Sequence, residues 1–217
     1  VEYIKSEKFK NKLSSDNEVH KLNPFVYNIF NDLNENLKVK IIEFATSDFM
    51  LKTANEYLGV FPILGRIYVN LNIPTGKEPR SSQLWHRDDF GYKNLDLFVA
   101  VNEINENNGP LITLKKKDPV HIFYRVKSEI KSGLKGERGK ILDRDFDYLN
   151  SNKDESENII KLKGNTGTAL FIDSIRNYHK GGFCRMGNRI TLRINYMTPD
   201  SSFPLENLDE ERRQWKQ

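Results

Sequence analysis

The chain has 217 residues, of which 37% are hydrophobic and 11% aromatic, which suits one domain with a substantial core. The formal net charge of +4 indicates no particular affinity for nucleic acid, and the single cysteine, Cys184, excludes an internal disulfide framework. No apolar run approaches the length of a membrane span, and no signal-peptide pattern opens the sequence. We therefore expect a cytoplasmic protein with no membrane partner.

The first 60 residues show the spacing of amphipathic helices. Apolar residues recur at helical intervals from Asn23 to Leu37 and again from Val39 to Leu58, and Gly59 follows as a C-cap. We predict that these helices pack against the outside of a sheet.

From Gly65 onward the hydrophobic period changes to two, which is typical of strands with one buried face. The predicted strands are Arg66 to Ile73, Asp96 to Ile104, Leu111 to Leu114, Ile159 to Leu162, Thr168 to Asp173 and Ile190 to Met197. Short strands after a helical region predict a mainly β fold with N-terminal helices. The specific expectation is a double-stranded β-helix, that is, a cupin-like jelly roll with helices packed on one sheet.

We expect residues 1–217 to form one domain, with residues 1–60 as helical support and residues 65–198 as the jelly-roll core. Residues 115–157 are dense in both charges, and we interpret them as an insert of helix and loop over one end of the barrel. This insert is either a lid over a site or a plain solvated excursion.

A His-x-Asp pair stands at His86 and Asp88. Residues i and i+2 of a strand project to the same side, so both side chains can reach one metal ion while Arg87 points away. Such a pair with a distant histidine is the ligand set of a facial triad, which holds Fe(II) and leaves other coordination positions open. Asp89 competes with Asp88 if the segment curls into a turn.

The chain has four histidines, so the third ligand is His20, His121 or His179. His179 follows a predicted strand and precedes a glycine-rich turn, an ordinary place for a ligand on the rim of a barrel; the plainer alternative is a loop histidine with one hydrogen bond. His20 lies in a polar region typical of a surface residue. His121 lies in the charged insert and is interpreted as structural or substrate-facing.

Arg189, Thr191 and Arg193 alternate along the last predicted strand and so share one face. A buried arginine needs an anion, and Arg189 with Thr191 offers a guanidinium fork plus a hydroxyl for one carboxylate, as on a 2-oxoacid. The alternative is an outward face of solvated arginines, and Arg193 also suits a structural ion pair. Tyr68 and Asn70 can hydrogen-bond the same ligand or lie on an exposed strand face.

Taken in order, these motifs resemble the phytanoyl-CoA dioxygenase-like branch of the Fe(II)/2-oxoglutarate-dependent dioxygenases. The resemblance runs over roughly Gly65 to Thr198 and rests on His86-x-Asp88, the Asn107-Asn108-Gly109-Pro110-Leu111 turn, His179 and Arg189. It implies that His86, Asp88 and His179 ligate iron. It also implies that Arg189 binds the distal carboxylate of 2-oxoglutarate.

The resemblance further implies a hydroxylase that releases succinate and CO2. In the family a Pro-Gly-Ser-His segment often follows the Asn-Gly-Pro turn, whereas this chain continues Leu114 to Asp118 as Leu-Lys-Lys-Lys-Asp, a difference that bears on the substrate. Lys115 to Lys117 favour an anionic or carrier-linked small molecule. The presence of Asp88, rather than glycine or alanine, disfavours the variant that binds a halide.

Two other functions stay open at this point. One is a non-catalytic jelly-roll binding domain, against which the intact ligand set argues. The other is an oxygenase acting on a protein or nucleic-acid group, which basic clusters interleaved with stacking aromatics would favour. Only Lys115 to Lys117 near Phe123 and Tyr124 fit that description, so we expect a small-molecule substrate with O2 and no nucleic-acid partner.

Overall fold

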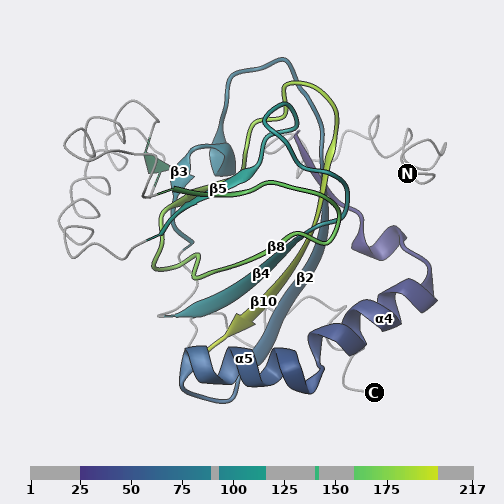
Figure 1. Cartoon of the computed structure of the whole chain (residues 1–217), viewed down its shortest axis with the longest axis vertical. Coiled ribbons are helices and arrows are strands. Elements are labelled where there is room, and N and C mark those ends of the chain that lie inside the picture. Colours follow the sequence, from purple (N-terminus) through teal and green to yellow (C-terminus); the bar gives the residue numbers. More distant parts are fainter. Residues whose placement is uncertain (1–24, 89–92, 116–139, 142–158, 200–217) are drawn as a thin grey trace.

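The computed structural model describes residues 25–88, 93–115, 140–141 and 159–199, in which the strands form two sheets with antiparallel pairing throughout (Figure 1). The first sheet has the order β1 (Val26–Asn28), β2 (Ile63–Asn72), β10 (Arg189–Met197), β4 (Asn94–Ala100) and β8 (Ala169–Ile172). The second has the order β6 (Lys140–Ile141), β3 (Trp85–His86), β9 (His179–Lys180), β5 (Leu111–Leu114) and β7 (Ile159–Leu162).

The chain crosses repeatedly between the two sheets. From β2 to β5, and again from β7 to β10, each strand lies in the other sheet from the strand before it. This alternation brings the beginning and end of the barrel side by side, since β2 and β10 pair over most of their length. The topology is that of a jelly roll, and the fold class predicted from the sequence is confirmed.

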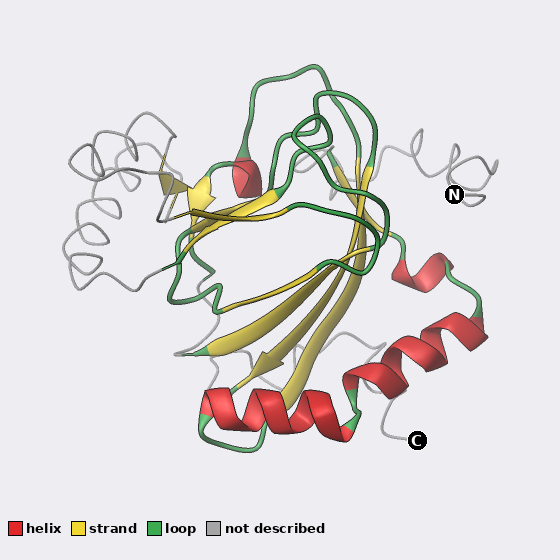
Figure 2. Ribbon diagram, viewed as in Figure 1, coloured by secondary structure: helices red, strands yellow, loops and turns green. Residues whose placement is uncertain are grey.

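Two helices cover the face of the first sheet that points away from the second sheet (Figure 2). They are α4 (Glu35–Ala45) and α5 (Asp48–Leu58), and short 3-10 turns stand at Phe30–Asp32 and Ser81–Gln83. Asn34 caps α4 by accepting a hydrogen bond from the Leu37 amide (2.9 Å), and Gly59 ends α5 in the left-handed conformation. No helix in the described part of the chain is long and apolar enough to cross a membrane.

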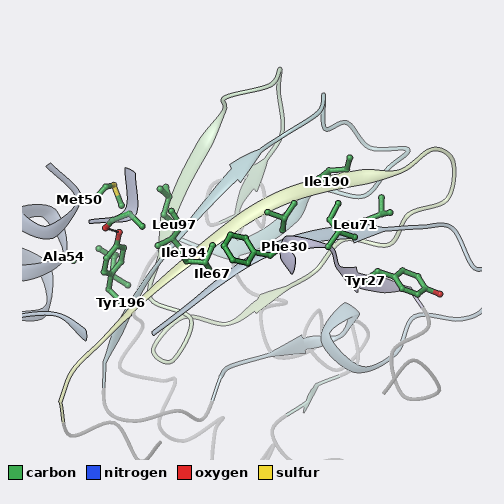
Figure 3. Packing of buried hydrophobic residues seen from close by; sticks show 14 of the residues in the cluster. Tyr27, Phe30, Met50, Ala54, Ile67, Leu71, Leu97, Ile190, Ile194 and Tyr196 are labelled. Atoms are coloured by element: carbon green, nitrogen blue, oxygen red, sulfur yellow. Dashed lines mark hydrogen bonds between the residues drawn. The ribbon is translucent and has the colours of Figure 1, made fainter. Parts of the chain in front are cut away.

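The main hydrophobic core lies between these helices and the first sheet. Met50 and Ala54 of α5 face Leu97 and Tyr196 of the sheet, and all four side chains are buried (Figure 3). The Tyr196 hydroxyl donates a hydrogen bond of 2.6 Å to the carbonyl of Ala45, which ties the end of α4 to β10. The predicted packing of helices on the outside of a sheet is therefore confirmed.

The helix predicted from Asn23 to Leu37 is wrong over its described first half. Val26–Asn28 instead forms edge strand β1, which pairs with the end of β2. The Asn28 side chain accepts hydrogen bonds from the amides of Phe30 (3.1 Å) and Val69 (3.2 Å), which bends the chain away from the sheet. Pairing with β2 satisfies the backbone that a helix would have satisfied internally, so tertiary contact overrides the apolar spacing.

The last strand separates two kinds of side chain. Ile190 and Ile194 point into the core under the helices, whereas Arg189, Thr191 and Arg193 point into a cavity between the sheets. The predicted two-sided pattern of this strand is confirmed. A row of polar and charged groups is thereby placed inside the barrel, where chemistry can be shielded from water.

Candidate metal centre

His86, Asp88 and His179 lie together where β3 ends and β9 begins. His86 on β3 and His179 on β9 stand directly opposite each other in the strand register, with ring centroids 4.3 Å apart. Asp88 Oδ1 lies 3.7 Å from His86 Nε2 and 3.8 Å from His179 Nε2. Ligand atoms of the three residues lie within 4.8 Å of one another, a spacing that one metal ion can bridge.

Each imidazole is oriented by a backbone carbonyl two residues earlier in the chain. His86 Nδ1 lies 2.8 Å from the carbonyl oxygen of Leu84, and His179 Nδ1 lies 3.2 Å from that of Asn177. A proton on Nδ1 that is donated to the carbonyl puts the lone pair that a metal would accept on Nε2. Both histidines are therefore held in the tautomer and rotation that a ligand needs.

The residues beside the two histidines face the other way. Lys180 lies over the Trp85 ring at 5.0 Å, and Arg87 lies over the Tyr178 ring at 5.2 Å. Trp85 and Tyr178 are buried in a separate small apolar cluster. This alternation agrees with the expected orientation of Arg87, and it shows why only every second residue here reaches the metal centre.

The Asp88 carboxylate is fixed by contacts on the side away from the histidines. Its Oδ2 accepts a hydrogen bond from Arg193 Nη2 (2.7 Å) and lies 2.9 Å from the Ser174 hydroxyl, which also contacts Asp96 Oδ2 at 2.5 Å. Burial by itself would raise the pKa of Asp88, but Arg193 and the two histidines outweigh burial and hold that pKa well below its usual range. Asp88 is therefore ionised and ready to act as a ligand.

A cavity of about 100 Å3 opens next to the histidines. Five of the residues predicted from the sequence to bind a cosubstrate or metal line it, namely Asn70, His86, His179, Arg189 and Thr191. Tyr68 is half-buried on the same face of β2 as Asn70 but is not one of the residues that line the cavity.

Arg189 is a buried cation with an incomplete set of partners. Only 5% of the residue is exposed, and Nη1 donates to the carbonyl of Gly182 at 3.2 Å. Its Nε is buried and has no hydrogen-bond partner among the described residues. No described carboxylate forms an ion pair with this guanidinium. Burial lowers the pKa of Arg189. An unpaired guanidinium is costly inside a protein, so the chemistry of this wall fits an anionic ligand.

The carbonyl that contacts Arg189 belongs to a tight crossing of two loops. A Cβ on Gly182 would lie 2.2 Å from the backbone of Gly109, and one on Gly109 would lie 2.5 Å from the backbone of Phe183. Gly109 also has a φ of +73°, which favours glycine. The Asn107–Leu111 turn and the Gly181-Gly182 turn can therefore pack this closely only because each has a glycine at the contact. This contact explains the glycines of both motifs.

We expect Gly182→Ala to destabilise the protein by about 3 kcal/mol, the upper end of the usual cost of overpacking, because backbone must move to admit the methyl group. Urea denaturation of both proteins measures this difference. Gly187→Asn is the matched control, since a Cβ at this position would have no atom within 4 Å and asparagine tolerates its φ of +75°. Its free energy of unfolding should stay within about 0.5 kcal/mol of wild type. Equal losses in both variants would mean that the crossing is not tight in solution.

Several residues of the site escaped the sequence prediction. Asn72, Ser82, Gln83, Phe98 and Leu111 also line the cavity. Asn72 could have been identified from the sequence, because it follows Asn70 by two residues and so shares its face of β2. Others are brought in by strand pairing, which a single sequence does not reveal.

Some predicted features fall outside the part of the chain that the structure describes. These are His20, His121, Asp89 and nearly all of the 115–157 insert. The interpretation of that insert as a lid or a solvated excursion stays a prediction.

No protein-family model matches the chain, and a search of curated proteins finds no match. Solved structures with a similar fold include AviO1 from Streptomyces viridochromogenes Tue57, with 12% identity over 82% of this chain and 68% of that chain and a TM-score of 0.48. They also include the epimerase SnoN from nogalamycin biosynthesis in complex with Fe3+, alpha ketoglutarate and nogalamycin RO (16% identity, 73% of this chain, 59% of that chain, TM-score 0.45). A third is EctD from S. alaskensis with bound Fe (16% identity, 79% of this chain, 56% of that chain, TM-score 0.46).

This chain therefore spans 56% to 68% of the length of these three proteins. The fold of this chain is similar to that of these proteins, two of which were solved with iron. The resemblance of the sequence to the phytanoyl-CoA dioxygenase-like branch of the Fe(II)/2-oxoglutarate-dependent dioxygenases stays a prediction.

Proposed function

We propose that the chain is a non-haem Fe(II)- and 2-oxoglutarate-dependent dioxygenase. The observation that carries this proposal is the combination found around one cavity. Two histidine nitrogens and one carboxylate oxygen converge at one end, and a buried arginine with an unpartnered Nε lines the same space. The first set suits Fe(II), and the second suits the distal carboxylate of a 2-oxoacid.

In this proposal His86, Asp88 and His179 hold the iron. Arg189 binds the distal carboxylate of 2-oxoglutarate with its guanidinium fork, and Thr191 on the same face of β10 donates its hydroxyl. Iron with its cosubstrate and O2 supplies the oxidising chemistry, which releases succinate and CO2. The part played by the protein is to orient the ligands and to keep water away from them between the two sheets.

The charges of the groups around the site support a dianionic cosubstrate. Arg189 and Arg193 carry one positive charge each, and Asp88 and Asp96 carry one negative charge each, so these protein groups are neutral together. A divalent cation and a dianion that bind as a pair preserve this neutrality in a poorly solvated site. A monocarboxylate 2-oxoacid would leave a net positive charge there, which is costly to bury.

The finer proposal is that the enzyme hydroxylates a small organic molecule. Lys115 to Lys117 and the positive net charge support an anionic or carrier-linked one. The ligand set is the same for hydroxylation, desaturation and ring closure, because these reactions differ in where the substrate lies.

The test begins with the purified wild-type chain under anaerobic conditions. Addition of Fe(II) and 2-oxoglutarate should produce a weak visible charge-transfer band, and admission of O2 should then produce succinate slowly without a substrate. Zn(II) in place of Fe(II) is the control, and it should give neither signal. A wild-type protein that shows no band and no succinate would leave the non-catalytic binding domain as the better description.

A further inference from the structure

The two oxygens of the Asp88 carboxylate have different surroundings. Oδ1 faces Nε2 of both histidines, whereas Oδ2 accepts a hydrogen bond from Arg193 Nη2 at 2.7 Å and lies 2.9 Å from the Ser174 hydroxyl. Ser174 has a single hydroxyl proton and lies closer to Asp96 Oδ2, at 2.5 Å, so Arg193 is the donor that occupies Oδ2 of Asp88. Oδ1 is therefore the oxygen left free for a metal.

Arg193 is itself held by a second carboxylate. Its Nε donates to Asp96 Oδ1 at 2.8 Å and its Nη2 donates to Asp96 Oδ2 at 2.9 Å, which is a two-pronged contact. Asp96 is completely buried and also accepts hydrogen bonds from Asn94 (3.1 Å) and Asn195 (2.9 Å). Burial alone would lower the pKa of Arg193, but Asp96 and Asp88 raise it, so the guanidinium stays charged.

We propose that Arg193, held in place by Asp96, is a positioning residue that restricts Asp88 to a single ligand oxygen. Three protein donor atoms then reach the metal, and the remaining positions stay open for a chelating cosubstrate and O2. A carboxylate free to bind through both oxygens would occupy one of those positions. This inference rests on the proposed function, because it requires a metal at the three ligands.

The arrangement predicts opposite effects of two substitutions on metal affinity. Arg193→Gln removes a positive charge beside the site and frees Oδ2, so a divalent cation should bind more tightly while 2-oxoglutarate binds more weakly. Asp96→Asn removes a negative charge but keeps the shape, so the charge of Arg193 is no longer balanced and the cation should bind more weakly. A role limited to stabilising the fold would move both variants in the same direction.

The experiment uses Co(II) as the probe, added to the metal-free full chain and followed by its visible absorption. Relative to wild type, we expect Arg193→Gln to bind Co(II) about tenfold more tightly, because a positive charge near the ion is removed. It should bind 2-oxoglutarate at least about tenfold more weakly. Asp96→Asn should bind Co(II) about tenfold more weakly. The Co(II) band of Arg193→Gln should also change in shape, because the ligand set of the ion changes.

Lys163→Gln is the control for net charge, since it removes an exposed cation that pairs with Glu106, and it should alter neither affinity. Arg193→Lys serves if Arg193→Gln does not fold, because it keeps the positive charge but loses the two-pronged contact with Asp96 that holds the side chain in place. It should weaken 2-oxoglutarate binding without weakening Co(II) binding, and an unchanged 2-oxoglutarate affinity would overturn the proposal.

Parallel losses of Co(II) and 2-oxoglutarate affinity in Arg193→Gln and Asp96→Asn, together with lower melting temperatures, would also overturn it. That result differs from failure of the proposed function, in which the wild-type chain itself takes up no Co(II) or shows no response to 2-oxoglutarate.

Discussion

His179→Ala should leave the protein folded but unable to hold iron, with the charge-transfer band and succinate formation both lost. His179 supplies one of the three converging donor atoms, and a ligand itself should contribute more than the roughly 10- to 100-fold in metal affinity that surrounding residues contribute. Anaerobic Fe(II) titration in the presence of 2-oxoglutarate measures the band directly. His86→Ala should behave in the same way, because the two rings stand opposite each other on β3 and β9.

His20→Ala and His121→Ala are the matched controls, since the chain has four histidines and the sequence assigns these two to other roles. Both should retain the band at wild-type intensity. Circular dichroism and the melting temperature show whether each variant keeps its fold. Retention of full iron affinity in His179→Ala, or its loss in His121→Ala, would mean that the third ligand has been misassigned.

The strands of the barrel were the most predictable part of the fold. Leu111–Leu114 and Ile159–Leu162 were predicted to the residue, because their apolar positions alternate and turn residues flank them. The apolar spacing from Val26 to Asn28 predicts a helix, but this stretch pairs with β2. That pairing depends on residues 40 or more positions away. Local periodicity identifies an element, but long-range pairing can override it.

The convergence of the three candidate metal ligands was predictable because these residues obey two local rules. His86 and Asp88 are two residues apart, and His179 is followed by a glycine-rich turn and by Arg189. The Arg193–Asp96 pair can be predicted only once the register between β10 and β4 is known. Asn195 stands directly opposite Asp96 on β4, so Arg193, two residues along β10, lies diagonally across from Asp96 on the same face.

Strand register thus does two things at this site. Within the second sheet it sets His86 opposite His179, and within the first sheet it brings Arg193 to Asp96. The two sheets meet at Asp88, whose Oδ1 faces the histidines and whose Oδ2 faces the arginine. Asp88 lies in a loop, but the groups on both sides of its carboxylate lie on strands. These rigid strands therefore hold Asp88 in a fixed orientation.

Arg189→Ala should bind 2-oxoglutarate at least about 30-fold more weakly than wild type, because truncating one partner of a buried, hydrogen-bonded charge pair commonly costs about 2 kcal/mol or more. Fe(II) affinity should stay within about threefold, since Arg189 contacts none of the three ligands and the substitution leaves Asp88 and Arg193 in place. Titration of the anaerobic Fe(II) protein with 2-oxoglutarate gives the first value, and titration with Fe(II) alone gives the second. Equal losses of both affinities would mean that Arg189 supports the metal centre rather than a cosubstrate.

A comparison of two 2-oxoacids assigns the effect to the distal carboxylate. The wild type should bind 2-oxoglutarate far more tightly than 2-oxopentanoate, which has a methyl group in place of that carboxylate, and Arg189→Ala should lose this preference. The stability of the ligand-free protein should not fall together with the affinity for 2-oxoglutarate. Arg189 is buried with an unpartnered Nε, so removing it from the ligand-free protein should leave the melting temperature unchanged or raise it, apart from any cost of the space left behind. A preserved preference for 2-oxoglutarate in the variant would place the carboxylate against another wall of the cavity.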